Sequence, residues 1–324
     1  MNLAAFNPVL VTGASGFVGA CVVRALLDRG ADVHVILRPA SRTWRLDGVR
    51  DRLRIHAADL LDAEATEAAV RAARPRTVLH LATHGAYESQ ADARTILQTN
   101  ILGTCHLLEA SRRAGVGLFV NTGSSSEYGF KSEPMKETDR LEPNSVYAVA
   151  KAAQTHLCAL AAAPGDMAVV TFRLFSVYGP WEEPTRLVPT VLRRARAGLP
   201  LEMAAPEIAR DFVYVEDVLA ALLDLPRLAG LRGEVINLGT GVETTLGEFV
   251  AVVKELLGSP SPVRWGAMRP RHWDTTRWVA DPAKARTLLG WEAKHTLRQG
   301  LAKTAAWLEH RGEGYGDTHH RAAG

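Results

Sequence analysis

Short runs rich in β-branched residues alternate with longer helical stretches through the first half of the chain. The expected strands lie at 8–12, 32–37, 53–57, 77–82, 118–122 and 167–174. The expected helices lie near 17–29, 62–73, 91–114 and 145–162. This alternation is typical of parallel strands joined by crossover helices. The sequence therefore predicts an α/β fold built on a doubly wound parallel sheet.

A glycine-rich turn separates the first expected strand from the first expected helix. The segment VLVTGASGFVG places Gly13, Gly16 and Gly19 there with the spacing G-x-x-G-x-x-G. Glycine permits a tight turn and lets backbone N–H groups approach phosphate oxygens at the start of a helix. A plain turn also explains three glycines, but their place between strand and helix favours a dinucleotide site of the Rossmann type.

The alternation becomes irregular in the second half of the chain, where prolines break it into short pieces. We expect a dinucleotide-binding domain at 1–174, mainly a smaller substrate-binding lobe at 175–310, and a loose tail at 311–324. The strand-like segments 210–215 and 234–239 are compatible with either lobe. His319 and His320 lie in the tail without a third ligand, so we expect no metal site there.

The charge and cysteine content argue against several classes of protein. The net charge of +3 is far from the basic field of a nucleic-acid binder, which favours a small-molecule partner. Cys21, Cys105 and Cys158 are widely spaced and form no Cys-x-x-Cys pair, so neither a disulfide framework nor a cysteine zinc site is indicated. No basic region precedes the first apolar residues, and no apolar run approaches about 18 residues. We therefore expect a cytoplasmic protein with no membrane or nucleic-acid partner.

The residues after the second expected strand bear on the choice of dinucleotide. NAD enzymes usually place a carboxylate there to accept from the ribose hydroxyls, whereas this chain has Arg38, Ser41 and Arg42. Cations suit a 2′-phosphate, so NADP(H) is preferred and NAD(H) remains possible; the arginines could also be solvated surface residues. Asp59, after the third strand, could accept from the adenine amino group or cap the next helix.

A tyrosine and a lysine stand four residues apart in the last expected helix of the first half. Tyr147 and Lys151, in NSVYAVAKAA, should project from one face of that helix. A neighbouring ammonium stabilises a phenolate, so we expect the pKa of Tyr147 to be lowered enough for it to act as a base. The spacing alone also arises by chance.

A series of motifs along the chain resembles, in order, those of the extended short-chain dehydrogenase/reductase family. They are TGASGFVG, HLAT, QTNILGT, GSSSEYG, YAVAK, RLFSVYGP, RDFVYVEDV and NLGTG. The resemblance is to that family's nucleotide-sugar epimerases, dehydratases and ketoreductases, and it runs from about Pro8 to Trp291. It implies a nicotinamide cofactor and a nucleotide-diphosphate sugar as substrate. It also implies that Ser124, Tyr147 and Lys151 are the catalytic residues.

The resemblance implies a larger set of binding residues. Those implied for the cofactor are Gly13, Ser15, Gly16, Phe17, Val18, Gly19, Arg38, Ser41, Arg42, Asp59, Leu60, Leu81, Ala82, Thr83, Asn100, Thr122, Tyr147, Lys151, Leu174, Ser176 and Val177. Those implied for the substrate are His84, Tyr87, Ser124, Ser125, Ser126, Ser176, Val188, Arg210 and Arg271, with Arg269 as an alternative to Arg271. Asn100 resembles a supporting residue of the family, but it could equally be a helix polar group that is satisfied locally.

The serine run bears on the reaction. Dehydratases of the family carry acids where this chain has Ser125 and Ser126, and Glu127 comes one residue later. On a strand-like extension Glu127 would face the opposite way, so elimination of water is disfavoured. The remaining hypotheses are reduction of a 4-keto sugar, which we place first, epimerisation at C4 with a tightly bound cofactor, and a non-catalytic dinucleotide sensor.

The helical segments at 91–114 and 145–162 carry more apolar and alanine surface than one sheet face should bury. Members of the family commonly dimerise by packing these two helices against those of a second subunit. The resemblance therefore implies a homodimer.

Overall fold

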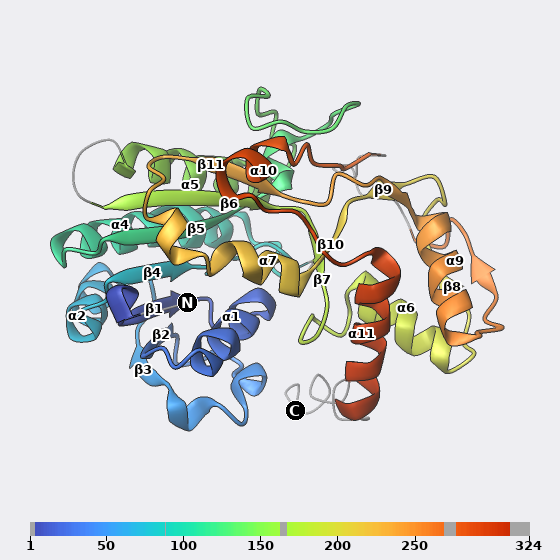
Figure 1. Cartoon of the computed structure of the whole chain (residues 1–324), viewed down its shortest axis with the longest axis horizontal. Helices are drawn as coiled ribbons and strands as arrows, with labels where there is room; N and C mark the ends of the chain where they lie inside the picture. The colour runs from blue at the N-terminus through green and yellow to red at the C-terminus, as the bar shows by residue number, and fades with distance from the viewer. Residues whose placement is uncertain (1–3, 88, 163–166, 269–276, 312–324) are drawn as a thin grey trace.

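The computed structural model describes residues 4–87, 89–162, 167–268 and 277–311. Its centre is a seven-stranded sheet with the strand order β11-β6-β5-β4-β1-β2-β3 (Figure 1). The strands are β1 (Val9–Thr12), β2 (Val33–Leu37), β3 (Arg54–Ala57), β4 (Thr77–His80), β5 (Leu118–Ser124), β6 (Ala168–Leu174) and β11 (Val235–Leu238). Every neighbouring pair is parallel, which confirms the predicted doubly wound sheet.

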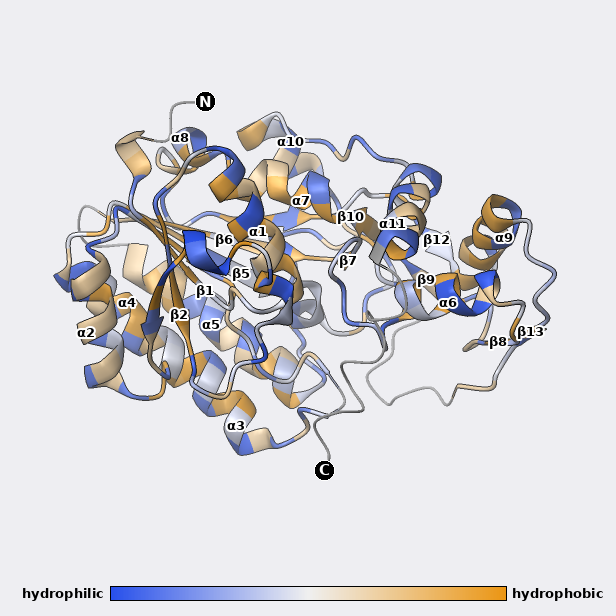
Figure 2. Cartoon of the chain, turned by 90° about the horizontal axis from the view of Figure 1, so that it is seen from below, coloured by the Kyte–Doolittle hydropathy of each residue, from blue (hydrophilic) through white to orange (hydrophobic). Residues whose placement is uncertain are grey.

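Helices cover both faces of this sheet (Figures 1 and 2). On one face lie α2 (Ala63–Ala73), α4 (Gly103–Arg113) and α5 (Val146–Ala162). On the other face lie α1 (Phe17–Asp28), α7 (Val215–Leu222), α8 (Leu225–Leu228) and α10 (Ala283–Leu289). Successive strand side chains point to opposite faces, so Val9 and Val11 enter one apolar core and Leu10 enters the other.

The second lobe packs three helices around its own apolar core. These are α6 (Leu187–Arg196), α9 (Leu246–Leu257) and α11 (Leu297–Arg311). Its short strands pair as β7 (Ser176–Tyr178) with β10 (Phe212–Tyr214), β9 (Ala209–Arg210) with β12 (Thr244–Thr245), and β8 (Leu201–Glu202) with β13 (Val263–Arg264). Of the two segments left open by the sequence, 234–239 therefore returns to the central sheet as β11, whereas 210–215 does not.

Short elements complete the described chain. They are η1 (Ala4–Phe6), η2 (Trp44–Leu46), η3 (Arg50–Arg52), α3 (Ala93–Leu97), the π-helix η4 (Gln98–Leu102) and η5 (Ser125–Tyr128). The helix predicted near 91–114 is thus three consecutive elements, α3, η4 and α4. No helix within the described ranges combines the length and the apolar character that crossing a membrane requires.

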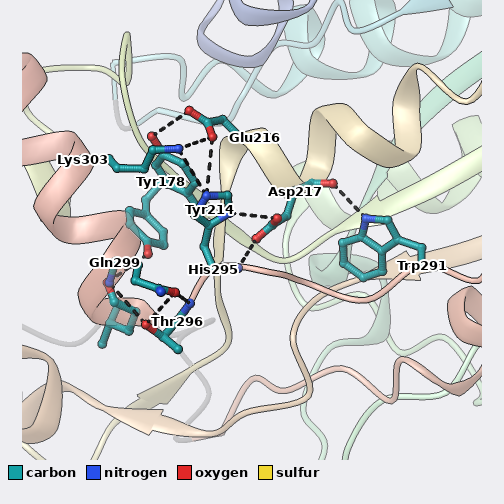
Figure 3. A network of polar contacts seen from close by, with 10 residues as sticks. Tyr178, Tyr214, Glu216, Asp217, Trp291, His295, Thr296, Gln299 and Lys303 are labelled. Atoms are coloured by element: carbon teal, nitrogen blue, oxygen red, sulfur yellow. Dashed lines mark hydrogen bonds and ion pairs between the residues drawn. The ribbon is translucent and has the colours of Figure 1, made fainter. Parts of the chain in front are cut away.

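Polar contacts from α7 fasten α11 to the sheet lobe (Figure 3). The Asp217 carboxylate lies 2.9 Å from His295 Nδ1 and accepts from the His295 backbone N–H at 3.1 Å. Trp291 Nε1 donates to the Asp217 carbonyl oxygen at 2.8 Å, and Lys303 of α11 pairs with Glu216. The YVEDV motif therefore anchors the C-terminal helix as well as starting α7.

Candidate active site

The glycine turn forms a cradle that any larger residue would fill. Gly13 has a φ of +69°, and a Cβ on it would lie 2.4 Å from the Leu81 carbonyl carbon. A Cβ on Gly19 would lie 2.1 Å from Gly13 O, so α1 packs directly against the turn. Gly16 precedes α1 and supplies no side-chain cap to it in the described structure, which leaves first-turn N–H groups for an anion. This cradle fits a dinucleotide pyrophosphate.

Most of the other predicted cofactor residues lie in the glycine turn or near the carboxyl ends of the strands. Ser15, Phe17 and Val18 belong to the turn and the start of α1. Leu81, Ala82 and Thr83 follow β4, and Leu60 follows β3. Thr122 lies two residues before the end of β5, Leu174 ends β6, and Ser176 and Val177 lie in β7. The carboxyl edge is the edge at which doubly wound sheets bind ligands.

The residues predicted to select the dinucleotide lie at the same edge. Arg38 and Arg42 follow β2 and are exposed, and the Ser41 N–H donates to Arg38 O at 2.9 Å. Burial lowers the pKa of His84, and the Arg38 cation lowers it further. Asp59 accepts from the Leu61 N–H at 3.0 Å. The helix-cap alternative for Asp59 is wrong, because Asp62 caps α2 by accepting from Ala65 N.

Tyr147 lies in the first turn of α5 and is partly buried. Burial raises the pKa of its phenol, while hydrogen bonds with the side chains of Ser124 and Thr83 oppose that shift. The structure therefore brings the predicted catalytic tyrosine and serine together from α5 and β5.

Lys151 is buried one helical turn beyond Tyr147. Its Nζ donates to Thr122 O and to Gln154 Oε1, both at 2.5 Å. Burial lowers the pKa of Lys151 to about 8, and the Glu127 charge opposes this. The expectation that the pKa of Tyr147 is lowered is wrong for the protein alone, because burial of the phenol outweighs the neighbouring donors and the Lys151 ammonium is directed to other acceptors.

The serine run ends β5 and forms η5, a turn of 3-10 helix. Ser124 Oγ donates to Ser126 Oγ at 3.0 Å and accepts from the Ser126 N–H at 3.1 Å. Ser125 is buried, and Ser126 is partly exposed. The predicted strand-like extension past Ser124 is therefore wrong, because a capping box formed by Ser124 and Glu127 turns the chain into a helix.

Glu127 faces the protein interior and is fully buried. One carboxylate oxygen accepts from the Ser124 N–H at 2.8 Å, and the other pairs with Arg173 at 2.8 Å. The expected placement on a strand-like extension is therefore replaced by a 3-10 turn, in which the carboxylate contacts Arg173 and the backbone N–H of Ser124. The carboxylate thus holds the backbone of Ser124 in place.

Asn100 supports the loop that follows β4. Its Oδ1 accepts from the His84 N–H at 2.9 Å and from Thr83 Oγ1 at 3.2 Å, and its Nδ2 donates to His84 O at 2.8 Å. These contacts reach the loop rather than the helix of Asn100, so the locally satisfied alternative is wrong. The π-helix η4 carries Asn100, and such turns often occur at functional sites.

Two of the predicted substrate residues, Arg210 and Val188, belong to the second lobe. Arg210 donates from Nη1 to Ala209 O at 2.9 Å, and its Cζ lies 5.3 Å from the Trp278 ring centroid. Val188 is buried in the core of the second lobe. Tyr87 follows β4, and burial raises the pKa of its phenol. Arg271 and its alternative Arg269 lie outside the described residues.

Arg186, which no sequence motif singled out, lies against the loop after β4. This exposed residue donates from Nη1 to Ala86 O at 3.3 Å, and its Cζ lies 5.7 Å from the Tyr87 ring centroid. Its charge also acts to lower the pKa of Tyr147, against the effect of burial. The sequence feature that could have pointed to Arg186 is its place directly before the helix-forming segment Leu187–Arg196.

A doubly wound sheet with this glycine cradle and a Tyr-x-x-x-Lys pair towards its carboxyl edge is the arrangement of a dinucleotide-dependent enzyme. A model of the NAD dependent epimerase/dehydratase family matches residues 9–239, and the chain belongs to that family. It is an NAD(P)-dependent enzyme of the extended short-chain dehydrogenase/reductase type, as the motifs indicated.

Relatives with different reactions share most of the chain. A dTDP-glucose 4,6-dehydratase of Streptomyces griseus is 30% identical over 318 residues, covering 94% of each protein. The UDP-glucose 4-epimerase of Thermotoga maritima, solved with UDP-glucose, is 28% identical with a TM-score of 0.85, covering 94% of this chain and 99% of its own. The UDP-glucose 4-epimerase of Thermus thermophilus, solved in complex with NAD, is 32% identical with a TM-score of 0.83 and the same coverage. The expected preference for NADP(H) finds no support in these relatives.

Proposed function

We propose that the chain epimerises a nucleotide-diphosphate sugar at C4 and keeps NAD tightly bound. The observation that carries this choice over dehydration is the placement of Glu127. It is the one carboxylate in segment 121–129, and it is buried against Arg173 and the Ser124 N–H. With Ser125 and Ser126 beside it, the segment offers hydroxyls and no acid to protonate a leaving hydroxyl group.

Each residue of the site has a part in this proposal. Tyr147 exchanges the proton of the C4 hydroxyl, and Ser124 orients that oxygen. Lys151 contributes a positive charge that favours the phenolate of Tyr147 during the reaction. The glycine cradle would hold the dinucleotide, whose nicotinamide would supply the hydride chemistry that inversion at C4 needs.

The substrate diphosphate requires cations. We assign this part to Arg210 together with Arg271, because a forked guanidinium suits phosphate oxygens. Arg186, next to Tyr87, adds a cation on the side of Tyr147. The segment 175–310 then provides most of the substrate-binding surface.

Reduction of a 4-keto nucleotide sugar is the second candidate. Arg38 and Arg42 favour it, since both are exposed at the edge where a 2′-phosphate of NADPH would lie. This candidate uses the same Ser124, Tyr147 and Lys151 as epimerisation does. The two reactions differ in the source of the hydride, which is added NADPH for reduction and the sugar itself for epimerisation.

The test is incubation of the purified protein with UDP- and dTDP-sugars, with and without added coenzyme. Interconversion of C4 epimers without added coenzyme supports epimerisation, and consumption of NADPH by a 4-keto sugar supports reduction. Formation of a 4-keto-6-deoxy product from a 6-hydroxy sugar would overturn the argument from Glu127. Affinities for NAD and NADP in the parent and in Arg38→Ala test the role of that arginine separately.

We also propose that the protein is a homodimer. An apolar stripe on α5 exposes Val146, Val149 and Leu160, whose exposed fractions are 41%, 45% and 70%. Leu97 and Leu102, at the ends of α3 and η4, are also exposed. Burying this stripe against its copy would remove these exposed apolar side chains from water.

A further inference from the structure

A chain of buried side chains links the strand before the glycine turn to Lys151. Thr12 Oγ1 lies 2.7 Å from His80 Nδ1, and His80 Nε2 lies 2.9 Å from Thr104 Oγ1. Gln154 Nε2 donates to the same hydroxyl at 3.0 Å, and Gln154 Oε1 accepts from Lys151 Nζ. All five side chains are at least 98% buried. The chain therefore crosses the layer between β1, β4, α4 and α5.

The hydrogen positions in this chain follow from one contact. The Thr104 hydroxyl donates to Asn100 O at 2.7 Å, so it can only accept from its other two neighbours. His80 must then carry its proton on Nε2 and accept from Thr12 at Nδ1. Burial lowers the pKa of His80 to about 3, which agrees with a neutral ring. The Gln154 amide nitrogen is likewise committed to Thr104, so its oxygen must face Lys151.

We propose that Gln154 is a positioning residue that holds the Lys151 ammonium in place and stabilises its charged form. Its neutral amide oxygen is the acceptor, and its amide nitrogen is held by Thr104, which is bonded to His80 of β4. The part of the proposal that concerns catalysis rests on the proposed function, in which Lys151 assists Tyr147. An ammonium has three N–H donors, and Thr122 O and Gln154 Oε1 take two of them. Because the ammonium is tetrahedral, these two hydrogen bonds also fix the direction of the third N–H of Lys151.

The neutrality of Gln154 matters because of the groups that face Lys151. Glu127 of η5 acts to raise the pKa of Lys151, but its carboxylate is paired with Arg173. Cys158 of α5 and His80 of β4 also interact with Lys151 electrostatically, and Tyr147 precedes it by one turn. An amide oxygen holds the ammonium without cancelling its charge, so the charge remains available to the phenol of Tyr147.

Two substitutions at Gln154 should shift the titration of Lys151 in opposite directions. Gln154→Met keeps the side-chain volume but removes the acceptor, and the midpoint should fall by about one to two pH units, as expected for one hydrogen bond to a charged group. Gln154→Glu places a carboxylate at the acceptor, and the midpoint should rise by about one unit or more. Thr155→Val is the matched control, because Thr155 is buried next to Gln154 and its Oγ1 has no hydrogen-bond partner among the described residues.

The direct measurement is an NMR titration of protein labelled with ¹³C at lysine Cε, with the Lys151 signal assigned by Lys151→Arg. Opposite shifts in the two Gln154 variants, with the control unchanged, support the proposal. Midpoints of both folded variants within about 0.3 unit of the parent would overturn it. If Gln154→Met fails to fold, the rise in Gln154→Glu decides.

The pH profile of turnover then links this residue to the reaction. Its alkaline limb should move with the Lys151 midpoint, to lower pH in Gln154→Met and to higher pH in Gln154→Glu. If the midpoints shift but the parent converts no nucleotide sugar, the positioning of Lys151 stands and the proposed function fails. If the parent is active and the midpoints do not move, the proposed function stands and the role of Gln154 is refuted.

Discussion

Glu127 and Arg173 form a buried ion pair directly beneath the serine run. The carboxylate lies 2.8 Å from Arg173 Nε, and the two side chains are 0% and 4% exposed. Arg173 also donates from Nη1 to Tyr128 Oη at 2.9 Å, and Glu127 accepts from the Ser124 N–H. The pair therefore connects β6 to the backbone of the serine that orients the substrate oxygen in the proposed reaction.

Glu127→Gln should destabilise the protein by about 3 to 5 kcal/mol, because it leaves the Arg173 cation buried without its partner. Urea unfolding followed by circular dichroism measures this change. Glu142→Gln is the control, because its ion pair with Lys131 is at the surface, where Glu142 is 50% exposed. Equal effects of the two substitutions would contradict the structural role given to Glu127.

The sheet could be predicted because its signals are local. β-branched runs such as VLVT and VHVIL are buried strands, and each of the six expected strands lies within two residues of its observed limits at both ends. The glycine turn was also predictable, since its spacing and its neighbours define it without any distant contact. The family motifs also made it possible to predict Ser124, Tyr147 and Lys151 as site residues. The structure places these three near the carboxyl end of β5.

What could not be predicted depends on contacts between distant residues. Glu127 is held by Arg173, which is 46 residues away, and this contact helps to turn the serine run into a 3-10 helix. The π-helix that carries Asn100 accompanies contacts between Asn100 and the loop after β4. Because these contacts join distant parts of the chain, the helical pattern of 91–114 did not reveal the π-helix. The pKa of Tyr147 depends on burial by the folded chain, which the spacing of Tyr147 and Lys151 does not reveal.

Tyr147→Phe should lower the turnover number by about a hundredfold or more, because it removes the proposed acid/base group. The affinity for NAD should remain within about threefold of the parent, since the ring and its packing are retained. Steady-state kinetics with the active nucleotide sugar and fluorescence titration with NAD provide the two values. Turnover within a factor of two of the parent would remove Tyr147 from the mechanism.

The proposed dimer predicts a concentration-independent mass of two chains at micromolar protein in light scattering. Val149→Glu combined with Leu160→Glu should give the monomer mass, because four charges would have to be buried in the contact between the α5 helices. Val242→Glu serves as control, because Val242 is 60% exposed in the segment between β11 and β12 and is not part of the proposed contact. A monomeric parent would refute the dimer outright.

The neutral state of buried His80 should make the protein sensitive to acid. Its pKa is lowered from 6.5 to about 3 by burial and by the Lys151 charge, so the unfolded chain binds a proton in a pH range where the folded chain does not. The contribution to stability is fully present above about pH 6.5 and is lost as the pH falls towards 3, at about 1.4 kcal/mol per pH unit. Between pH 7 and pH 5 this group alone should cost about 2 kcal/mol.

His80→Gln isolates this contribution, because it removes the one imidazole and leaves the rest of the sequence unchanged. The variant should be less stable than the parent at pH 7, since it disturbs the contacts with Thr12 and Thr104. Its stability should fall less between pH 7 and pH 5, so the gap between the proteins should narrow by about 2 kcal/mol. Urea unfolding of both proteins at the two pH values measures the gap. A gap of the same size at both values would mean that His80 does not stay neutral in the folded protein.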